Sequence, residues 1–166
     1  MRKSRVQVPF TAVGLAMAFA LTSPATAQMN GDPSVHRTLD AFHQAASDAD
    51  FDGYMGLFTD DAVFLGTDAT ERWTRDEFAE YVAAAFGRGR GWTYVATARW
   101  VSVSADGSTA WFDEKLENDN LGDTRGSGVL IRVDGEWRIA QYNLTIPIPN
   151  ALAGEVVARI RESGGA

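Results

Sequence analysis

The sequence predicts one α+β domain, residues 28–166, in which N-terminal helices pack on one face of an antiparallel sheet. Two observations predict this fold class. Apolar residues recur with the period of a helix in the first half of the chain, and four segments with the alternation of strands fill the second half. The composition agrees with one ordinary globular domain, since 45% of the residues are hydrophobic and 22% are charged.

Three segments of the first half have the apolar spacing of a helix. Asp32 and Pro33 predict the start of the first helix, as its N-cap and its first-turn proline. Its buried stripe is Val35, Leu39, Phe42 and Ala46. A shorter helix, with the stripe Phe51, Tyr54, Met55 and Phe58, is expected to end at Asp60-Asp61, before a strand over 62–65. Thr74-Arg75-Asp76-Glu77 predicts a capping box for a third helix, with the stripe Phe78, Tyr81, Val82 and Ala85.

The second half is predicted to be mostly sheet. Strands are expected over residues 92–104, 109–118, 124–133 and 136–146. Asp106-Gly107 and Asp134-Gly135 are turn signals between them, and Pro147 ends the last strand. The spacing of Leu152, Val156 and Ile160 predicts a short amphipathic tail helix.

The composition excludes several classes of protein. The chain has 166 residues and no cysteine, which rules out a disulfide scaffold, a zinc finger and a cysteine-ligated iron–sulfur cluster. Its formal net charge is −7, whereas a nucleic-acid-binding surface needs a basic face. We therefore expect no nucleic-acid partner and no cofactor.

The first 27 residues have the layout of a secretory signal peptide. Arg2, Lys3 and Arg5 precede a mostly apolar stretch over residues 6–21, and Ala25-Thr26-Ala27 supplies a cleavage signal. A membrane anchor is the alternative, but the stretch is short for a span, which needs about 20 residues. Cleavage before Gln28 leaves 139 residues with 12 basic and 22 acidic side chains, a net charge of −10. We expect this chain to be periplasmic or secreted and to have no membrane contact.

The turn at Asp134-Gly135 decides which residues of the last two strands share a face. A two-residue turn pairs Val133 with Glu136, and therefore Ile131 with Arg138. A three-residue turn with a glycine bulge instead pairs Ile131 with Trp137. We prefer the second register because it keeps apolar residues together. It places Ser127 opposite Gln141 and Arg125 opposite Asn143.

This register predicts a polar end on an otherwise apolar sheet face. Glu114 shares its face with Phe112 on the preceding strand and lies within diagonal reach of Arg125. A buried carboxylate needs a partner, and arginine is the natural one. We expect Glu114, Arg125, Gln141 and Asn143 to converge there. They would form either the polar floor of a ligand pocket or a structural ion pair at the edge of the sheet.

The opposite sheet face predicts a homodimer. It is expected to carry Trp111, Leu130, Tyr142 and Leu144, and an exposed face this apolar usually meets a partner. We expect two copies of the chain to pair through this face. The alternative is that the tail helix covers it.

From about Pro33 to Asn150, the chain resembles the SnoaL-like branch of the nuclear transport factor 2-like superfamily. The matching stretches are residues 58–64 (FTDDAVF), 111–114 (WFDE) and, most familiar, 134–143 (DGEWRIAQYN). The last stretch is similar to the final hairpin of SnoaL-like proteins and of the calcium/calmodulin-dependent kinase association domain.

The resemblance implies a cone-shaped, cystatin-like roll, with a pocket between the helices and a curved antiparallel sheet and with dimerisation through that sheet. The superfamily includes ketosteroid isomerase, polyketide cyclases, epoxide hydrolases and many proteins with no known catalysis, so the fold does not settle the function. Related proteins often carry histidine where Asn143 stands. This chain has no histidine beyond His43, which excludes a histidine base in the last strand.

The polar loop over residues 66–73 (GTDATERW) is placed by the resemblance at the rim of the pocket. In one interpretation, Asp68 or Glu71 faces the ligand and Trp73 forms an apolar wall. In the other, the loop is a structured turn in which Asp68 bonds the local backbone and Glu71 pairs with Arg72 or Arg125.

A metal site on the first helix is a weaker interpretation. His36, Asp40 and His43 have the spacing i, i+4 and i+7, which could present metal ligands. The stripe borders the buried face, however, and no fourth ligand is evident. We expect no metal.

These observations together predict an exported domain that binds a small, largely apolar molecule. Phe58, Phe64, Trp73 and Phe112 are expected to line its cavity, and Glu114 and Arg125 to fix a polar group with help from Gln141 and Asn143. In an enzyme, Glu114 or Asp68 would be the base, with a pKa raised by burial. Arg125 or Asn143 would then stabilise the developing negative charge. The alternatives are a non-catalytic homodimeric interaction module, or an isomerase or hydrolase with carboxylate acid–base chemistry.

Overall fold

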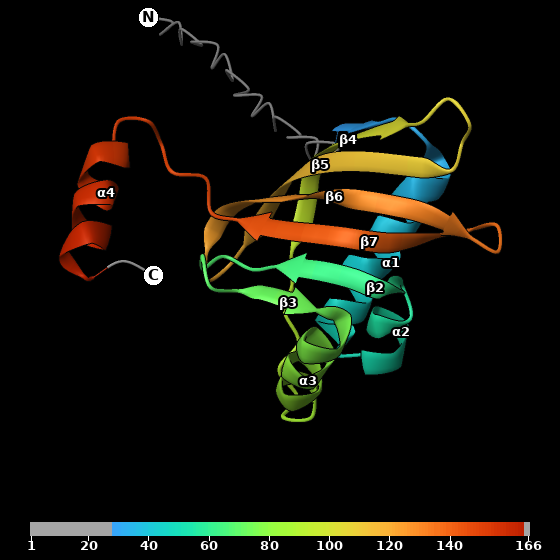
Figure 1. Ribbon diagram of the computed structural model, residues 1–166, viewed down its shortest axis with the longest axis horizontal. Coiled ribbons are helices and arrows are strands. Elements are labelled where there is room, and N and C mark those ends of the chain that lie inside the picture. The colour runs from blue at the N-terminus through green and yellow to red at the C-terminus, as the bar shows by residue number, and fades with distance from the viewer. Residues whose placement is uncertain (1–27, 165–166) are drawn as a thin grey trace, which may run out of the picture.

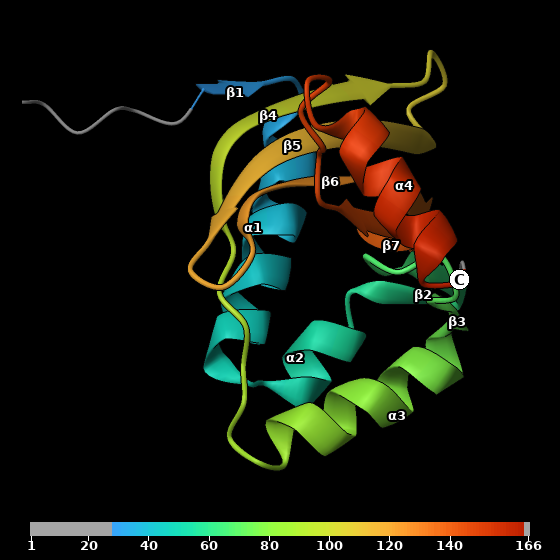
Figure 2. The ribbon, with the colours of Figure 1, turned by 90° about the vertical axis from the view of Figure 1, so that its left-hand side faces the viewer.

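The computed structural model describes residues 28–164, so the predicted signal peptide lies outside the described residues. These residues form one mixed sheet of seven strands. The sheet curls around the first two helices, and the third helix lies across one end of the layer (Figure 2). The predicted α+β architecture, with N-terminal helices on one face of a curved sheet, is confirmed.

The strands are β1 (Gln28–Asn30), β2 (Phe58–Leu65), β3 (Arg72–Thr74), β4 (Val95–Val103), β5 (Thr109–Asn118), β6 (Gly122–Val133) and β7 (Glu136–Thr145). The helices are α1 (Pro33–Asp48), α2 (Phe51–Met55), α3 (Arg75–Phe86) and α4 (Ala153–Glu162). The order of the strands in the sheet is β1-β4-β5-β6-β7-β2-β3, and β4 to β7 are antiparallel neighbours. The short β1 pairs with β4 in parallel, and so does β2 with β7.

The predicted helix starts are confirmed. The Asp32 side chain accepts a hydrogen bond from the Ser34 backbone N–H at 2.7 Å, which caps α1. Thr74 and Glu77 form the reciprocal bonds of a capping box at the start of α3. These bonds satisfy backbone donors that lack partners within a helix.

The second helix is shorter than predicted, because Phe58 begins β2 instead of closing a helical stripe. The backbone of Phe58 pairs with that of Ile139 in β7, and the Ile139 N–H donates to the Leu57 carbonyl at 2.8 Å. Phe58 is buried. A buried phenylalanine fits the period of either element, so the apolar pattern alone could not separate the two.

The preferred register of the last hairpin is wrong. Asp134 and Gly135 both have positive φ, 52° and 85°, as a two-residue type I′ turn requires. Val133 therefore pairs with Glu136. Near the turn, Leu130 pairs with Ile139. A bulge in β7 then skips one residue, so that the next pair is Val129 with Gln141.

The bulge turns the far half of β7 over. Tyr142 and Leu144 now point into the core and are buried, as is Leu130 of β6. Of the four residues predicted on the outer face, Trp111 alone lies there, with 51% of its surface exposed. The homodimer stays a prediction, and the outer face is less apolar than the sequence suggested.

The predicted tail helix is confirmed as α4, which has no buried residue. It stands apart from the sheet (Figure 1), so it does not cover the outer face. Within residues 28–164, no helix combines the length and the apolar character that crossing a membrane requires.

Candidate functional site

A buried carboxylate, Glu114, lies at the centre of a network that joins one helix and three strands. Alternation along β5 turns Glu114 inward, where it is 0% exposed. Its Oε2 accepts a hydrogen bond from Arg99 Nε of β4 at 2.7 Å. Its Oε1 lies 2.8 Å from His43 Nε2 of α1 and accepts the Tyr142 hydroxyl of β7 at 2.9 Å. Such partners are what a buried charge needs, because burial without them is costly.

Arg99 connects this carboxylate to the surface. Its side chain is fully buried, and Nη1 donates to Asp40 Oδ1 at 2.8 Å and to the His36 carbonyl at 3.3 Å. The Asp40 side chain is 63% exposed. The guanidinium therefore lies between a buried and an exposed carboxylate.

The partners decide the charge of Glu114. Burial by itself raises the pKa of Glu114, but the His43 hydrogen bond and the charges of His43 and Arg99 outweigh it and lower that pKa below the ordinary value. Burial and the adjacent Glu114 charge raise the pKa of Tyr142 well above its usual range. Glu114 is thus an ionised acceptor, so we assign the proton between it and His43 to His43 Nε2. The prediction of a burial-raised pKa for Glu114 is wrong.

Gly126 has no side chain, and this leaves room for Glu114 and Tyr142. A side-chain carbon at this β6 position would stand 2.7 Å from Glu114 Oε1 and would also clash with the Tyr142 hydroxyl. Only glycine avoids this overlap. Gly126 therefore has a packing role beside Glu114.

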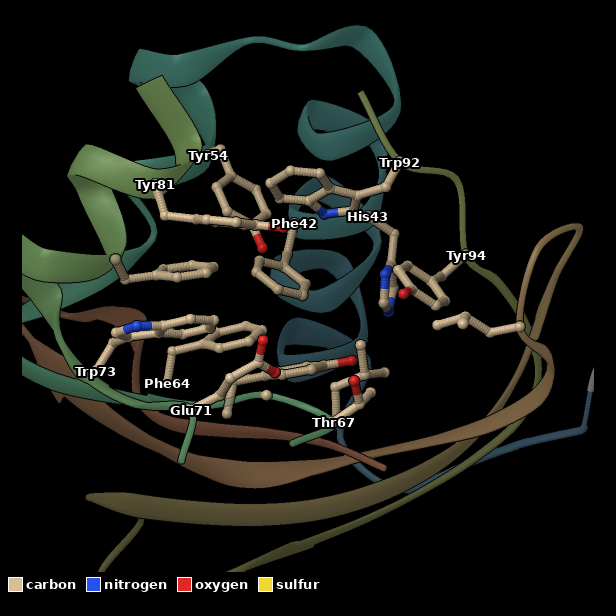
Figure 3. Close-up of a pocket in the computed structure, with 15 residues that line it drawn as sticks. Phe42, His43, Tyr54, Phe64, Thr67, Glu71, Trp73, Tyr81, Trp92 and Tyr94 are labelled. Atoms are coloured by element: carbon tan, nitrogen blue, oxygen red, sulfur yellow. The ribbon is translucent and has the colours of Figure 1, made fainter. Parts of the chain in front are cut away.

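An aromatic cavity of about 220 Å³ lies beside the network, and His43 and Tyr142 belong to both. The cavity is bounded by the rings of Tyr54, Phe64, Trp73, Tyr81, Trp92 and Tyr94, among others. In Figure 3, Tyr54 and Trp92 lie on one side of it, with Phe64, Glu71 and Thr67 on the other and His43 beside Tyr94. Its volume is below the roughly 300–1,000 Å³ of pockets for drug-sized ligands, which suits a small molecule.

The packing of its rings fixes one wall of the cavity. Phe64 stacks on Phe78 with centroids 3.9 Å apart and rings 10° from parallel. Phe64 also stacks with Tyr142, with centroids 5.6 Å apart and rings 14° from parallel. Tyr142 is therefore held by ring contacts as well as by its bond to Glu114.

The structure brings together some of the predicted site residues. Glu114 is buried at the polar end of the core, and Phe64 and Trp73 line the cavity. Phe58 and Phe112 are buried in the core without lining the cavity. The expected pair of Glu114 with an arginine exists, but the arginine is Arg99.

Four predicted site residues lie elsewhere. Arg125, Gln141 and Asn143 share the outer face of the sheet, where Arg125 and Gln141 are exposed. The bulge in β7 and the two-residue turn account for this difference. Asp68 is exposed in the loop before β3, where bonds from the Thr70 hydroxyl and backbone N–H lower its pKa. It is a structured-turn residue, as the second interpretation of that loop had it.

The sequence analysis missed the roles of Arg99, His43 and Tyr142. Arg99 was within reach of the same argument, because alternation along β4 places it on one face with Val101 and Val103. The spacing of His43 and Asp40 on one helix suggests metal ligands, but Asp40 pairs with Arg99, which also pairs with Glu114. Among the described residues, His, Cys, Asp and Glu form no group that could hold a metal ion.

Comparison with known structures agrees with this fold. A nuclear transport factor 2-like protein of unknown function from Pseudomonas putida KT2440 is 14% identical, with a TM-score of 0.60 over 70% of this chain and 86% of that one. A protein with a cystatin-like fold from Caulobacter vibrioides is 17% identical, with a TM-score of 0.59 over 76% and 96%. A candidate scytalone dehydratase from Novosphingobium aromaticivorans DSM 12444 is 14% identical, with a TM-score of 0.56 over 69% and 83%. At these identities the likeness shows the fold alone.

The sequence itself identifies the family. A comparison with curated proteins finds no match. The family model of the SnoaL-like domain, however, matches residues 35–149, which contain the whole of the network and the cavity. Because this match spans well over half of the chain, the protein belongs to the SnoaL-like domain family of the nuclear transport factor 2-like superfamily.

Proposed function

We propose that the protein binds a small, largely apolar molecule in the aromatic cavity and that His43 exchanges a proton with it. The position of His43 carries this proposal. Its ring lines the cavity, and its Nε2 lies 2.8 Å from the buried Glu114. A carboxylate behind an imidazole fixes the orientation and tautomer of the ring and stabilises the imidazolium that forms when the ring accepts a proton.

The two ring nitrogens of His43 have different roles. Nε2 donates to Glu114, and no hydrogen bond within residues 28–164 engages Nδ1. In the neutral ring, Nδ1 is then the nitrogen that can accept a proton. Glu114 is a positioning residue, because its two oxygens are already engaged by His43, Arg99 and Tyr142.

A neutral ketone with an acidic C–H bond tests binding and proton exchange together. We choose 2-tetralone, whose binding is measured by calorimetry and whose deuterium uptake at C1 from heavy water is followed by NMR. In this exchange, the imidazole takes the C1 proton, the C–H electron pair forms the enolate, and the exchanged imidazolium returns a deuteron to C1. We expect His43→Gln to keep binding but to slow the catalysed exchange by roughly 10²–10⁴-fold. Unchanged exchange would refute the role of His43.

A plug at the mouth tests the location of binding. Thr67 is exposed and lines the cavity, whereas Thr70 is exposed in the same loop but does not line it. We expect Thr67→Trp to abolish 2-tetralone binding and the matched Thr70→Trp to leave it intact. Equal binding by both variants, or no binding by the wild type, would refute the cavity as the ligand site.

We also propose that the chain is exported to the periplasm or beyond the cell. The basic start, the apolar stretch and Ala25-Thr26-Ala27 support export. The intact mass of the protein from the exported fraction of its source should correspond to a chain that begins at Gln28. A mass that includes residues 1–27 would contradict cleavage.

A further inference from the structure

We infer that the ligand of this cavity carries a positive charge, so that the site recognises a small amine or quaternary ammonium compound. This ligand class depends on the proposed function, since it concerns the same cavity. Three features of the cavity point to it: the rings around it, the sign of the charge in its lining, and the charge of the network behind it.

Aromatic rings surround the cavity from several directions. Nine of its 15 lining residues are Phe, Tyr or Trp, and they come from α1, α2, α3, β2, β3, β7 and the segment before β4. Figure 3 shows rings on opposite sides, such as Trp92 above and Phe64 below. The face of each ring carries negative potential and attracts a cation within about 6 Å of its centroid. An ammonium group in this cavity would have aromatic rings on more than one side, and it would meet the face of each ring that no stacked neighbour covers, since Phe64 and Phe78 cover one another.

The lining of the cavity includes a carboxylate but, among the described residues, no lysine or arginine. The carboxylate belongs to Glu71. The Glu71 carboxylate is held in place, because its Oε2 accepts the Asp68 backbone N–H at 3.1 Å and it lies over Gly66, where a side chain would collide with it. The neighbouring Arg72 is exposed and does not line the cavity.

The network behind His43 is also negative. Two carboxylates, Glu114 and Asp40, surround one guanidinium, Arg99, which leaves a net charge of −1 when His43 is neutral. Opposite charges attract more strongly where water is excluded. An anionic ligand would therefore meet repulsion from the rings, from Glu71 and from the network. For an ammonium group, the same three features would offset the free energy that is lost when the group leaves water.

A matched pair of ligands isolates the effect of the charge. Choline and 3,3-dimethylbutan-1-ol have nearly the same shape, but the first has a quaternary nitrogen where the second has a carbon atom. Calorimetry with the wild-type protein should show choline binding about tenfold more tightly, a difference of about 1.4 kcal/mol. Glu71→Gln keeps an acceptor for the Asp68 N–H, and we expect it to remove most of that preference while leaving 3,3-dimethylbutan-1-ol unaffected. Asp68→Asn, in the same loop but outside the cavity, should change neither affinity.

The outcomes separate this ligand class from the proposed function. Equal affinities for choline and its neutral analogue would overturn the cationic ligand. Binding of 2-tetralone without binding of choline would also overturn it, and the proposed function would stand. If none of the three compounds binds, both are overturned.

Discussion

Replacing Glu114 with glutamine removes the negative charge that His43, Arg99 and Tyr142 share. Removing one partner of a buried ion pair costs roughly 3–5 kcal/mol, because the other charge stays buried without compensation. Glutamine keeps one oxygen as an acceptor, and Arg99 keeps its bond to Asp40. We therefore expect the low end of that range, about 3 kcal/mol. A domain of ordinary stability, about 5–15 kcal/mol, remains folded after such a loss.

Urea unfolding followed by tryptophan fluorescence measures this loss, since Trp137 is buried in the native core. Glu117→Gln is the matched control, because Glu117 lies on the same strand but is exposed. We expect this control to stay within about 0.5 kcal/mol of the wild type. Equal unfolding free energies for the two variants would refute the description of Glu114 as a stabilising buried charge.

The stabilisation that Glu114 provides should depend on pH. Partner groups hold the pKa of Glu114 below its ordinary value of 4.5, so the unfolded chain binds the Glu114 proton more readily than the native state does. The resulting stabilisation is complete above the unfolded-state pKa and is lost as the pH falls through the lower native pKa. The difference in unfolding free energy between the wild type and Glu114→Gln should therefore shrink below about pH 4.5. A difference that stays constant down to acid unfolding would contradict an ionised Glu114.

Three further variants test the surroundings of the network and the outer face. Gly126→Ala should lower the free energy of unfolding in urea by about 1–3 kcal/mol, because the added methyl group overpacks against Glu114. Gly154→Ala is the control and should not lower it, since a side-chain carbon there meets nothing within 4 Å. Equal effects of the two variants would contradict the tight fit at Gly126. Tyr142→Phe removes one hydrogen bond to a buried charge and should cost about 1.5–3 kcal/mol in the same assay, so a neutral substitution would contradict that bond. For the proposed homodimer, sedimentation velocity should show a dimeric wild type and a monomeric Trp111→Glu variant, since Trp111 is exposed on the outer face. A monomeric wild type, or a variant that stays dimeric, would contradict pairing through this face.

Local signals in the sequence predicted much of the fold. Asp32, Thr74 and Glu77 cap helices through bonds to backbone groups two or three residues away, so they could be recognised without knowledge of the rest of the chain. The apolar stripe of α1 was equally clear, because Val35, Leu39, Phe42 and Ala46 are all buried. Long-range pairing was harder. The short strands β1 and β3 depend on distant partners, and a three-residue segment carries little pattern of its own.

The candidate site depended on features that the sequence pattern could not fix. A single extra residue at the β7 bulge decides whether Tyr142 or Asn143 faces the core, and apolar matching in the hairpin favoured the wrong register. Glu114 was found because alternation along β5 is regular and a carboxylate on an apolar face is conspicuous. Its partners come from α1, β4 and β7, up to 71 residues away, and only the packing of helix against sheet brings them together.

Binding of a ligand beside His43 is the central claim, and intermolecular NMR contacts test it most directly. With 2-tetralone bound to the wild-type protein, we predict nuclear Overhauser effects from the ligand to the ring protons of both His43 and Phe64, which line the same cavity. Contacts to Trp111 on the outer face, without contacts to His43 and Phe64, would contradict the account.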